Sequence, residues 1–310
     1  MNISYYATTE TVRKDSKLQY HFLRENSRSG VSRGLSDEWV YSSRDTKSGR
    51  GKILRHLNVV VIGLACAACA FGQGNFEVQV YASELTPKGV TMVELHTNFT
   101  VKGTKETVDG VLPTHHALHE TLEITHGFNE WFECGFYQFI SRQADGSWKW
   151  VGTHIRPRVS IPERYKLPVG LSLSQEIGYQ RPNFDPDTWT WEIRPIIDKQ
   201  LGKLYLSFNP TIEKSFHGPG KDSGASFSPN VKVAYDVHSR VAMGLEYYGA
   251  YGKVFSWDRP RDTEQAFLPA IDVDFGKAWE FNFGVGIGVT HNTDHLLVKA
   301  IVGYRFNLKK

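Results

Sequence analysis

Histidine side chains gather in one short stretch, His115-His116-Ala-Leu-His119, and Glu123 follows four residues later. On a strand, side chains two or four residues apart share a face, so His115, His119 and Glu123 would point the same way. Imidazole and carboxylate groups are ligands that zinc accepts. The run opens a predicted strand beside a long loop, however, and no Cys or Asp cluster completes the set. We therefore expect neither a metal site nor a cofactor.

Catalytic chemistry would require a nucleophile, a base and an orienting group assembled at one place. The sequence offers two His and Ser combinations, His126 with Ser141 and His154 with Ser160, and no serine motif surrounds either. The stretch FGVGIGV carries Gly at every second strand position and lacks a following helix, so it does not predict a phosphate-binding loop. We expect no catalytic residue.

Ionisable side chains of both signs recur at alternate positions, which places them on one face of their strands. One interpretation is a water-filled route whose fixed charges select solutes. The other is a closed interior held together by paired charges, because an unpaired buried charge is costly. The candidates for this inward, lumen-lining face are Glu94, His96, Glu123, Glu133, Arg156, Arg158, Glu176, Glu192, Arg194, Lys232, Glu280, Lys299 and Arg305, together with Glu213, Glu246 and Asp272.

Three of these candidates, Arg156, Arg158 and Arg194, form a positive group on two nearby strands. In an open route they would bias ion selectivity, because fixed charges raise the local concentration of counterions. In a packed interior they would form a salt-bridged ladder with Glu176 on the strand between them. The sequence leaves both arrangements open.

The elements that must position these side chains are strands. From Val90 onward, apolar residues repeat with a period of two in segments of about 10–14 residues, separated by Gly, Pro, Asn and Asp. In Ala278–Thr290, aromatic and aliphatic side chains occupy one face, and glycine and polar side chains the other. No long helix is predicted. The twelve predicted strands cover residues 90–101, 115–126, 131–142, 148–160, 168–180, 188–198, 203–214, 225–236, 240–251, 265–275, 278–290 and 294–306.

The connections between these strands mostly alternate in length. The links at 127–130, 161–167, 199–202, 237–239 and 276–277 are mostly tight, and those at 102–114, 181–187, 215–224 and 252–264 are longer, although the alternate links 143–147 and 291–293 are short. An even strand number with this alternation is typical of bacterial outer-membrane barrels, whose periplasmic turns are short and whose extracellular loops are longer. The sequence therefore predicts an all-β fold, a transmembrane antiparallel up-and-down β-barrel of about 12 strands over residues 90–310.

A soluble β-sandwich is the alternative fold, since it also buries aromatic residues in alternating strands. Its outer faces would be wet, whereas the outward faces here carry almost no charge at mid-strand, where a charge in a bilayer costs about 2–4 kcal/mol. Tryptophans near strand ends, such as Trp131, Trp148 and Trp279, suit the aromatic girdles of a membrane barrel. The formal charge of +3 and the lack of a basic block with interleaved aromatics exclude nucleic acid from the expected partners.

Export is predicted by a short apolar segment ahead of the strands. Val59–Phe71 is apolar for about 13 residues, too short for a spanning helix, which needs about 20. Basic residues precede it and small-x-small patterns follow, so residues 52–72 are predicted to be a signal peptide cleaved near Ala70–Gly72. Lipidation at Cys66 or Cys69 and a retained anchor are alternatives, although neither cysteine follows a lipobox.

The flanks of this signal have their own predictions. Residues 1–51 are polar and rich in Ser and Arg, and are predicted to be a disordered leader, unless translation begins near Gly51–Leu54. Residues 73–89 include the extra alternating segment Phe76–Leu85, predicted to be a periplasmic lead-in, an extra strand or a piece tucked into the barrel. Of three cysteines only Cys134 lies beyond the signal, so no intramolecular disulfide is expected.

Several stretches carry a family resemblance: HALHETLEITHGFNEWFECGFY, WTWEIRPIID and WEFNFGVGIGVTHNTDHLLVKAIVGYRF. Over about Phe76 to Phe306 the chain resembles bacterial outer-membrane β-barrel proteins, in particular acidobacterial-type envelope proteins and the transporter group of the MetA pathway of phenol degradation. Gly303, Phe306 and Leu308 resemble the assembly signal of such barrels, although the chain ends in Lys309-Lys310 and not in an aromatic residue. The resemblance implies location and architecture, and no catalytic residue.

These observations predict an integral protein of the bacterial outer membrane that acts as a passive pore or transporter for small solutes. A membrane-embedded lipid-modifying hydrolase and a non-conducting structural or surface-binding barrel are the alternatives. The expected partners are outer-membrane lipid and lipopolysaccharide, the barrel-assembly machinery and a small-molecule solute.

Overall fold

The computed structural model describes residues 76–307. The predicted leader (1–51), the signal peptide (52–72) and the assembly residue Leu308 lie outside the described residues. No helix within 76–307 is both long enough and apolar enough to cross a membrane.

Twelve strands of 10 to 14 residues make up the described part of the chain. Their bounds are β1 (Thr91–Lys102), β2 (Leu118–Gly127), β3 (Phe132–Arg142), β4 (Trp148–Ser160), β5 (Gly170–Gln180), β6 (Trp189–Leu201), β7 (Leu204–His217), β8 (Ser226–His238), β9 (Val241–Ala250), β12 (Glu264–Asp274), β13 (Trp279–Gly288) and β14 (Leu296–Phe306). The loop after β9 holds a small hairpin, β10 (Gly252–Lys253) and β11 (Ser256–Trp257), and two 3-10 turns are η1 (Glu163–Tyr165) and η2 (Pro219–Asp222).

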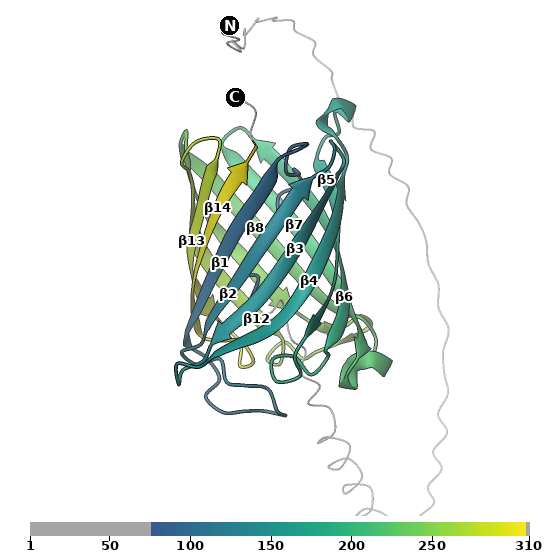
Figure 1. The fold of residues 1–310 in the computed structure, drawn as a ribbon, viewed down its shortest axis with the longest axis vertical. Coiled ribbons are helices and arrows are strands. Elements are labelled where there is room, and N and C mark those ends of the chain that lie inside the picture. The colour runs from purple at the N-terminus through teal and green to yellow at the C-terminus, as the bar shows by residue number, and fades with distance from the viewer. Residues whose placement is uncertain (1–75, 308–310) are drawn as a thin grey trace, which may run out of the picture. The chain divides into compact units, whose positions relative to one another are not determined.

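These strands form a closed antiparallel barrel (Figure 1). Each strand pairs with its neighbours in chain order, and pairing of β1 with β14 and of β8 with β9 completes the ring. The predicted fold class and the twelve strands are confirmed, with every boundary within three residues of its prediction. The predicted start of β2, at residue 115, was wrong, since the strand begins at Leu118. His116 has a positive φ of 60°, which is incompatible with extended backbone, so the strand starts after it.

The two ends of the barrel differ as the link lengths predict. At one end, called the turn end, β1 begins and β14 ends. The same end carries the links 128–131, 161–169, 202–203, 239–240 and 275–278. The other, called the loop end, carries 103–117, 143–147, 181–188, 218–225, 251–263 and 289–295. Two links have only two residues, 202–203 and 239–240. In the first, between β6 and β7, Gly202 takes a φ of 62° that most side chains disfavour.

The outer face of the wall is apolar at mid-strand. Exposed side chains there include Leu95, Leu122, Ile124, Phe136, Ile155, Ile177, Phe208, Leu245, Phe283, Ile287 and Val302. Exposed tryptophans stand at or beside strand ends, among them Trp131, Trp148, Trp189 and Trp279. A closed barrel with an apolar belt between aromatic rims has the build of a bacterial outer-membrane protein.

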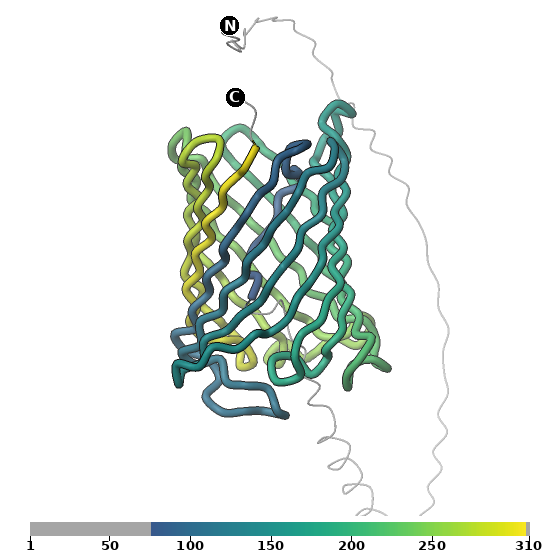
Figure 2. Tube along the Cα trace, in the orientation of Figure 1, coloured from purple at the N-terminus to yellow at the C-terminus, as the bar shows by residue number. Residues whose placement is uncertain are grey.

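A segment of the chain that belongs to no strand lies inside the ring (Figure 2). We call residues 76–86 the inner segment. Phe76, Val78, Val80 and Tyr81 in it are at most 8% exposed. Phe76 packs with Tyr137, Phe139, Val151 and Phe184, and Val78 and Val80 pack with Tyr248, Leu268 and Leu297. Of the arrangements open for this stretch, the structure has the one tucked into the barrel.

Candidate functional site: the filled lumen

The structure places all sixteen lumen-lining candidates of the sequence analysis on the inward face of the wall. Ten are buried, namely Glu94, His96, Glu123, Glu133, Arg156, Arg158, Glu176, Arg194, Glu246 and Lys299. The other six are partly exposed, namely Glu192, Glu213, Lys232, Asp272, Glu280 and Arg305. The alternation that selects them is set by the pleat, because successive side chains of a strand point to opposite faces.

Arg156 on β4 is the most connected of these side chains. Its Nη2 lies 2.6 Å from Glu123 Oε1 on β2, and its Nη1 lies 3.7 Å from Glu77 on the inner segment. Its guanidinium also covers the rings of Tyr81 and Tyr137, at 4.5 and 4.9 Å from their centroids. Arg156 therefore joins two elements of the wall to the inner segment through charge and cation–π contacts.

The other two arginines of the positive group have different partners. Arg158 Nε lies 3.5 Å from Glu133, and its Nη2 donates to the carbonyl oxygens of Ala82 and Glu84. Arg194 Nη2 lies 2.7 Å from Glu192. A salt-bridged ladder through Glu176 is one of the two arrangements that the sequence leaves open. It is absent from the ion pairs of residues 76–307, where Glu176 pairs with His154 of the neighbouring strand.

A second charge network lies across the lumen. Lys299 on β14 and Lys232 on β8 both approach Glu246 on β9, and Lys232 Nζ is also 2.8 Å from Asp272. Lys299 Nζ donates to the carbonyl oxygen of Val78, 3.0 Å away in the inner segment. Nearer the turn end, Arg305 pairs with Glu280.

Side chains of the wall bind the backbone of the inner segment. Asn209 Oδ1 accepts from the amide of Tyr81 at 2.7 Å, and Ser207 Oγ donates to the carbonyl of Tyr81 at 2.7 Å. Thr121 Oγ1 donates to the carbonyl of Phe76 at 2.6 Å. Asp198 accepts from the amide and the hydroxyl of Ser83. With Arg158 and Lys299, these contacts reach the segment from opposite sides of the ring, so it fills the lumen.

The sequence analysis missed these anchors. Thr121, Asp198, Ser207 and Asn209 stand at inward positions of the same alternation that selected the charged candidates. The alternation therefore contains these positions, but it does not single them out, because Thr, Ser and Asn carry no charge that marks an inward face. The Tyr81 ring lies under the guanidinium groups of Arg156 and Arg194. Tyr81 belongs to Phe76–Leu85, the segment whose place the sequence leaves open.

Cavities flank the inner segment. At the loop end, a cavity of about 200 Å³ is lined by Phe76, Val78, Leu112, His119, Phe184 and Leu268, among others. At the turn end, a space of about 900 Å³ is lined by residues 82–88 and by the links of that end. A smaller space of about 90 Å³ beside Glu77 touches Glu176, Glu192 and Glu213. Residues of the inner segment line all three spaces.

Two loops fold over the loop end. The amide of Leu112 donates to the carbonyl of Asn183 at 2.9 Å, which ties residues 103–117 to residues 181–188. Burial in the second loop raises the pKa of Asp185 to about 6. The Asp185 carboxylate accepts from the amide of Asp187 at 2.8 Å.

The histidine run and the His and Ser combinations do not assemble into sites. His115 stacks on His116 in the loop, whereas His119 lines the loop-end cavity against Phe76. His126 lies on the outward side of β2, where its Nδ1 contacts the Thr91 hydroxyl, while Ser141 is fully buried on the inward side. Ser160 lies six residues along β4 from His154, and its hydroxyl donates to the carbonyl of Ser83.

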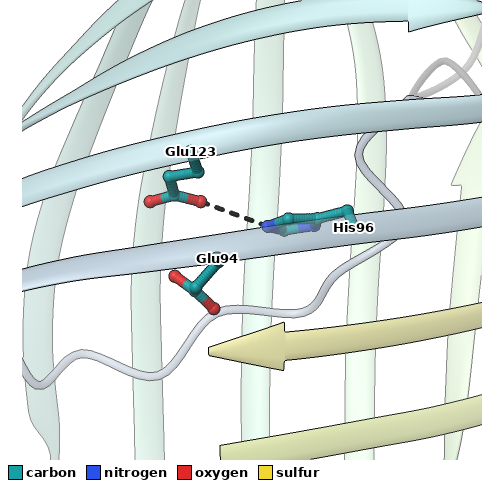
Figure 3. A group of neighbouring side chains, drawn as sticks. All are labelled: Glu94, His96 and Glu123. Atoms are coloured by element: carbon teal, nitrogen blue, oxygen red, sulfur yellow. Dashed lines mark ion pairs between the residues drawn. The ribbon is translucent and has the colours of Figure 1, made fainter. Parts of the chain in front are cut away.

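A different group of side chains has the arrangement of metal ligands. Glu94 and His96 on β1 and Glu123 on β2 place one ligand atom each within 4.8 Å of the others (Figure 3). All three are buried. The sequence analysis, which expected no metal site, had placed Glu123 with the histidine run and had named the other two only as lumen charges.

No family model matches the chain. No curated protein matches it either. Among solved structures it is similar to the KdgM porin in complex with disordered oligogalacturonate, at a TM-score of 0.44 and 10% identity over 70% of this chain and 99% of that chain.

Two further similar structures are the Acinetobacter baumannii outer membrane protein Omp33 and LpxR from Salmonella typhimurium. Omp33 gives a TM-score of 0.38 and 10% identity over 70% of this chain and 97% of that chain. LpxR gives 0.35 and 7% over 69% of this chain and 99% of that chain. TM-scores below 0.5 at such identities carry no information on solute or activity.

Proposed function

We propose that this protein is an outer-membrane channel for small solutes whose lumen is closed by its own inner segment. The observation that carries the proposal is that the inner segment runs within the ring without pairing to any strand (Figure 2), with Phe76, Val78, Val80 and Tyr81 buried there. A lumen that holds a peptide is wide enough for a small solute. If the segment withdraws, the cavity of the loop end and the space of the turn end become continuous.

The way the segment is held supports its withdrawal. Side chains of the wall bind its backbone, and no ladder of backbone hydrogen bonds does. Each such bond contributes about 0.5–1.5 kcal/mol net, because water replaces it when it breaks. Withdrawal would also uncover Arg156, Arg158 and Arg194 around the place of Tyr81, which makes the open route attractive to anions.

The partners follow from the two surfaces of the wall. The apolar belt would contact outer-membrane lipid, and the loop end would meet lipopolysaccharide if it faces outward, as the longer loops of such barrels do. Gly303 and Phe306 on β14, with Leu308, would present the signal for the barrel-assembly machinery.

Two other functions are less well supported. A lipid-modifying hydrolase needs a nucleophile beside a base, and neither His and Ser combination comes together. A non-conducting barrel needs the inner segment to stay in place permanently. The difference between that barrel and a channel is whether the inner segment moves.

A disulfide lock tests this movement. The Cβ that a side chain at Gly170 would have lies 3.2 Å from Ser83 Cβ, close to the 3.5–4.5 Å that a disulfide spans. Ser83→Cys with Gly170→Cys, in a Cys134→Ser background, would therefore tie the inner segment to β5, once the Asp198 carboxylate turns aside. Conductance in planar bilayers is measured before and after reduction, with each single cysteine variant as a control.

The oxidised lock is expected to be silent, and reduction is expected to restore the conductance of the single-cysteine controls. Conductance through the oxidised lock would show a route that the segment does not close. No conductance from the wild type, the controls or the reduced protein would contradict a channel and leave the non-conducting barrel.

A further inference from the structure

We propose that Glu94, His96 and Glu123 bind a divalent transition-metal cation, of which Zn²⁺ is the first candidate, on the inner face of the barrel wall. Glu94 and His96 lie two residues apart on β1 and so share its inward face. Glu123 lies directly opposite Glu94 in the register of β1 and β2. Figure 3 shows the three side chains converging, with His96 Nε2 3.3 Å from Glu123 Oε2.

Hydrogen bonding within the protein leaves these ligand atoms unsatisfied. Apart from the 3.3 Å contact between His96 Nε2 and Glu123 Oε2, the ring nitrogens of His96, Glu94 Oε1 and Glu123 Oε2 have no hydrogen-bond partner among residues 76–307. His96 and Glu123 are fully buried and Glu94 is 7% exposed. A buried polar atom without a partner costs about 1–3 kcal/mol. One cation would satisfy an atom of each side chain.

The charges around the group are unbalanced in the direction that favours a cation. Three glutamates stand in one row across the wall. Glu94 on β1 is in register with Glu123 on β2 and, on its other side, with Gly303 on β14. Gly303 is in turn in register with Glu280 on β13. Arg305 pairs with Glu280 and Arg156 with Glu123. Within the described residues, Glu94 has no lysine or arginine within ion-pair distance. A cation shared with Glu123 supplies the missing positive charge.

The ligand types point to a transition metal. Two carboxylates and one imidazole suit Zn²⁺, which binds such oxygen and nitrogen atoms at about 2.0–2.2 Å. Ca²⁺ takes six to eight oxygen ligands, more than this group offers. The competing arrangement is a proton shared by Glu94 and Glu280, which lie within hydrogen-bond reach of each other. It would satisfy Glu94 without any metal.

The site lies close to an anchor of the inner segment. Glu123 binds Arg156 through one carboxylate oxygen and faces His96 with the other, and Arg156 reaches Glu77 of the inner segment. The proposal does not depend on conduction, however. A barrel that never opens could hold the same cation.

Metal content tests the proposal directly. Tag-free protein is stripped with chelator while unfolded, refolded in detergent with or without ZnCl₂, and separated from free metal by gel filtration. One Zn²⁺ per folded barrel is expected by elemental analysis. Glu94→Gln and His96→Gln are expected to lower the bound zinc at least tenfold, whereas the matched control His119→Gln, another buried inward histidine, keeps it.

A measurement on the wild type keeps the test independent of how the variants fold. X-ray absorption of the zinc-loaded protein should show oxygen and nitrogen neighbours with one imidazole. Two or more imidazoles would place the metal at His115 and His116 and overturn the proposal. A folded wild type without zinc, or full zinc content in folded Glu94→Gln, would overturn it equally, and the first result would favour the shared proton.

Discussion

On the outer face of the wall, Leu95, Phe136 and Ile155 are 42–48% exposed, whereas Arg156, next in sequence to Ile155, is 3% exposed on the inner face. Burial therefore runs opposite to hydrophobicity along single strands. The outer face meets lipid, which accepts apolar side chains, and the inner face is covered by the inner segment and by its own ion pairs. One side of each strand is stabilised by transfer into lipid and the other by specific partners.

The two faces should consequently respond to mutation in different ways. On the inner face, the cost of a substitution depends on which partner is left unpaired, because buried charges need specific neighbours. On the outer face, the cost depends on depth in the bilayer, because lipid has no specific partners. Three substitutions test this contrast.

The largest effect is expected at Arg156. Arg156→Gln leaves Glu123 and Glu77 without their guanidinium, so the free energy of unfolding should fall by about 3–5 kcal/mol. Urea unfolding of protein folded in lipid vesicles measures it. The double variant Arg156→Gln with Glu123→Gln should recover part of the loss. Equal or greater loss in the double variant would mean that the two side chains are not coupled.

A smaller effect is expected on the outer face. Val285, at mid-strand on β13, points away from the lumen between the buried Gly284 and Gly286. Val285→Arg should lower the free energy of unfolding by about 2–4 kcal/mol, because it places a charge near the bilayer midplane. Val289→Arg is the depth control, beyond the end of the same strand, and should cost about 0–1 kcal/mol. Equal costs at both positions would contradict a membrane belt.

The smallest effect concerns Asp185, which lies outside the wall in the loop 181–188 at the loop end. The pKa of Asp185 is about 6 in the folded protein, against 3.8 for an ordinary Asp. As pH rises, this carboxyl therefore ionises in the unfolded chain before it ionises in the folded protein. The free energy of unfolding of the wild type consequently falls between about pH 4 and pH 6. Asp185→Asn removes that loss and keeps an oxygen for the Asp187 amide. The variant should match the wild type near pH 4 and exceed it by up to about 3 kcal/mol at pH 7. A difference independent of pH would contradict the raised pKa.

Much of the fold could be predicted because it is local. Alternation in β13 and β14 assigns each side chain to a face, and the short and long links order the strands around a ring. The start of β2 was predicted wrongly because the positive φ of His116 belongs to a turn, and the alternation of apolar residues does not indicate it. Gly286 illustrates another limit: alternation places it on the inward face, but only the structure shows that a Cβ there would lie 3.0 Å from Leu268 Cγ of the neighbouring β12.

The sequence by itself determined the twelve strands, their inward and outward faces and the apolar belt, since each of these depends on residues two positions apart. Only the tertiary structure decided where residues 76–86 lie and which charges pair. Arg156 meets Glu123 across two strand pairings, and Lys299 reaches Val78 from 221 residues away. The same holds for Glu94, His96 and Glu123, whose register joins two strands. Closure of the ring brings these groups together, and a period of two carries no information about which inward side chains will then face one another.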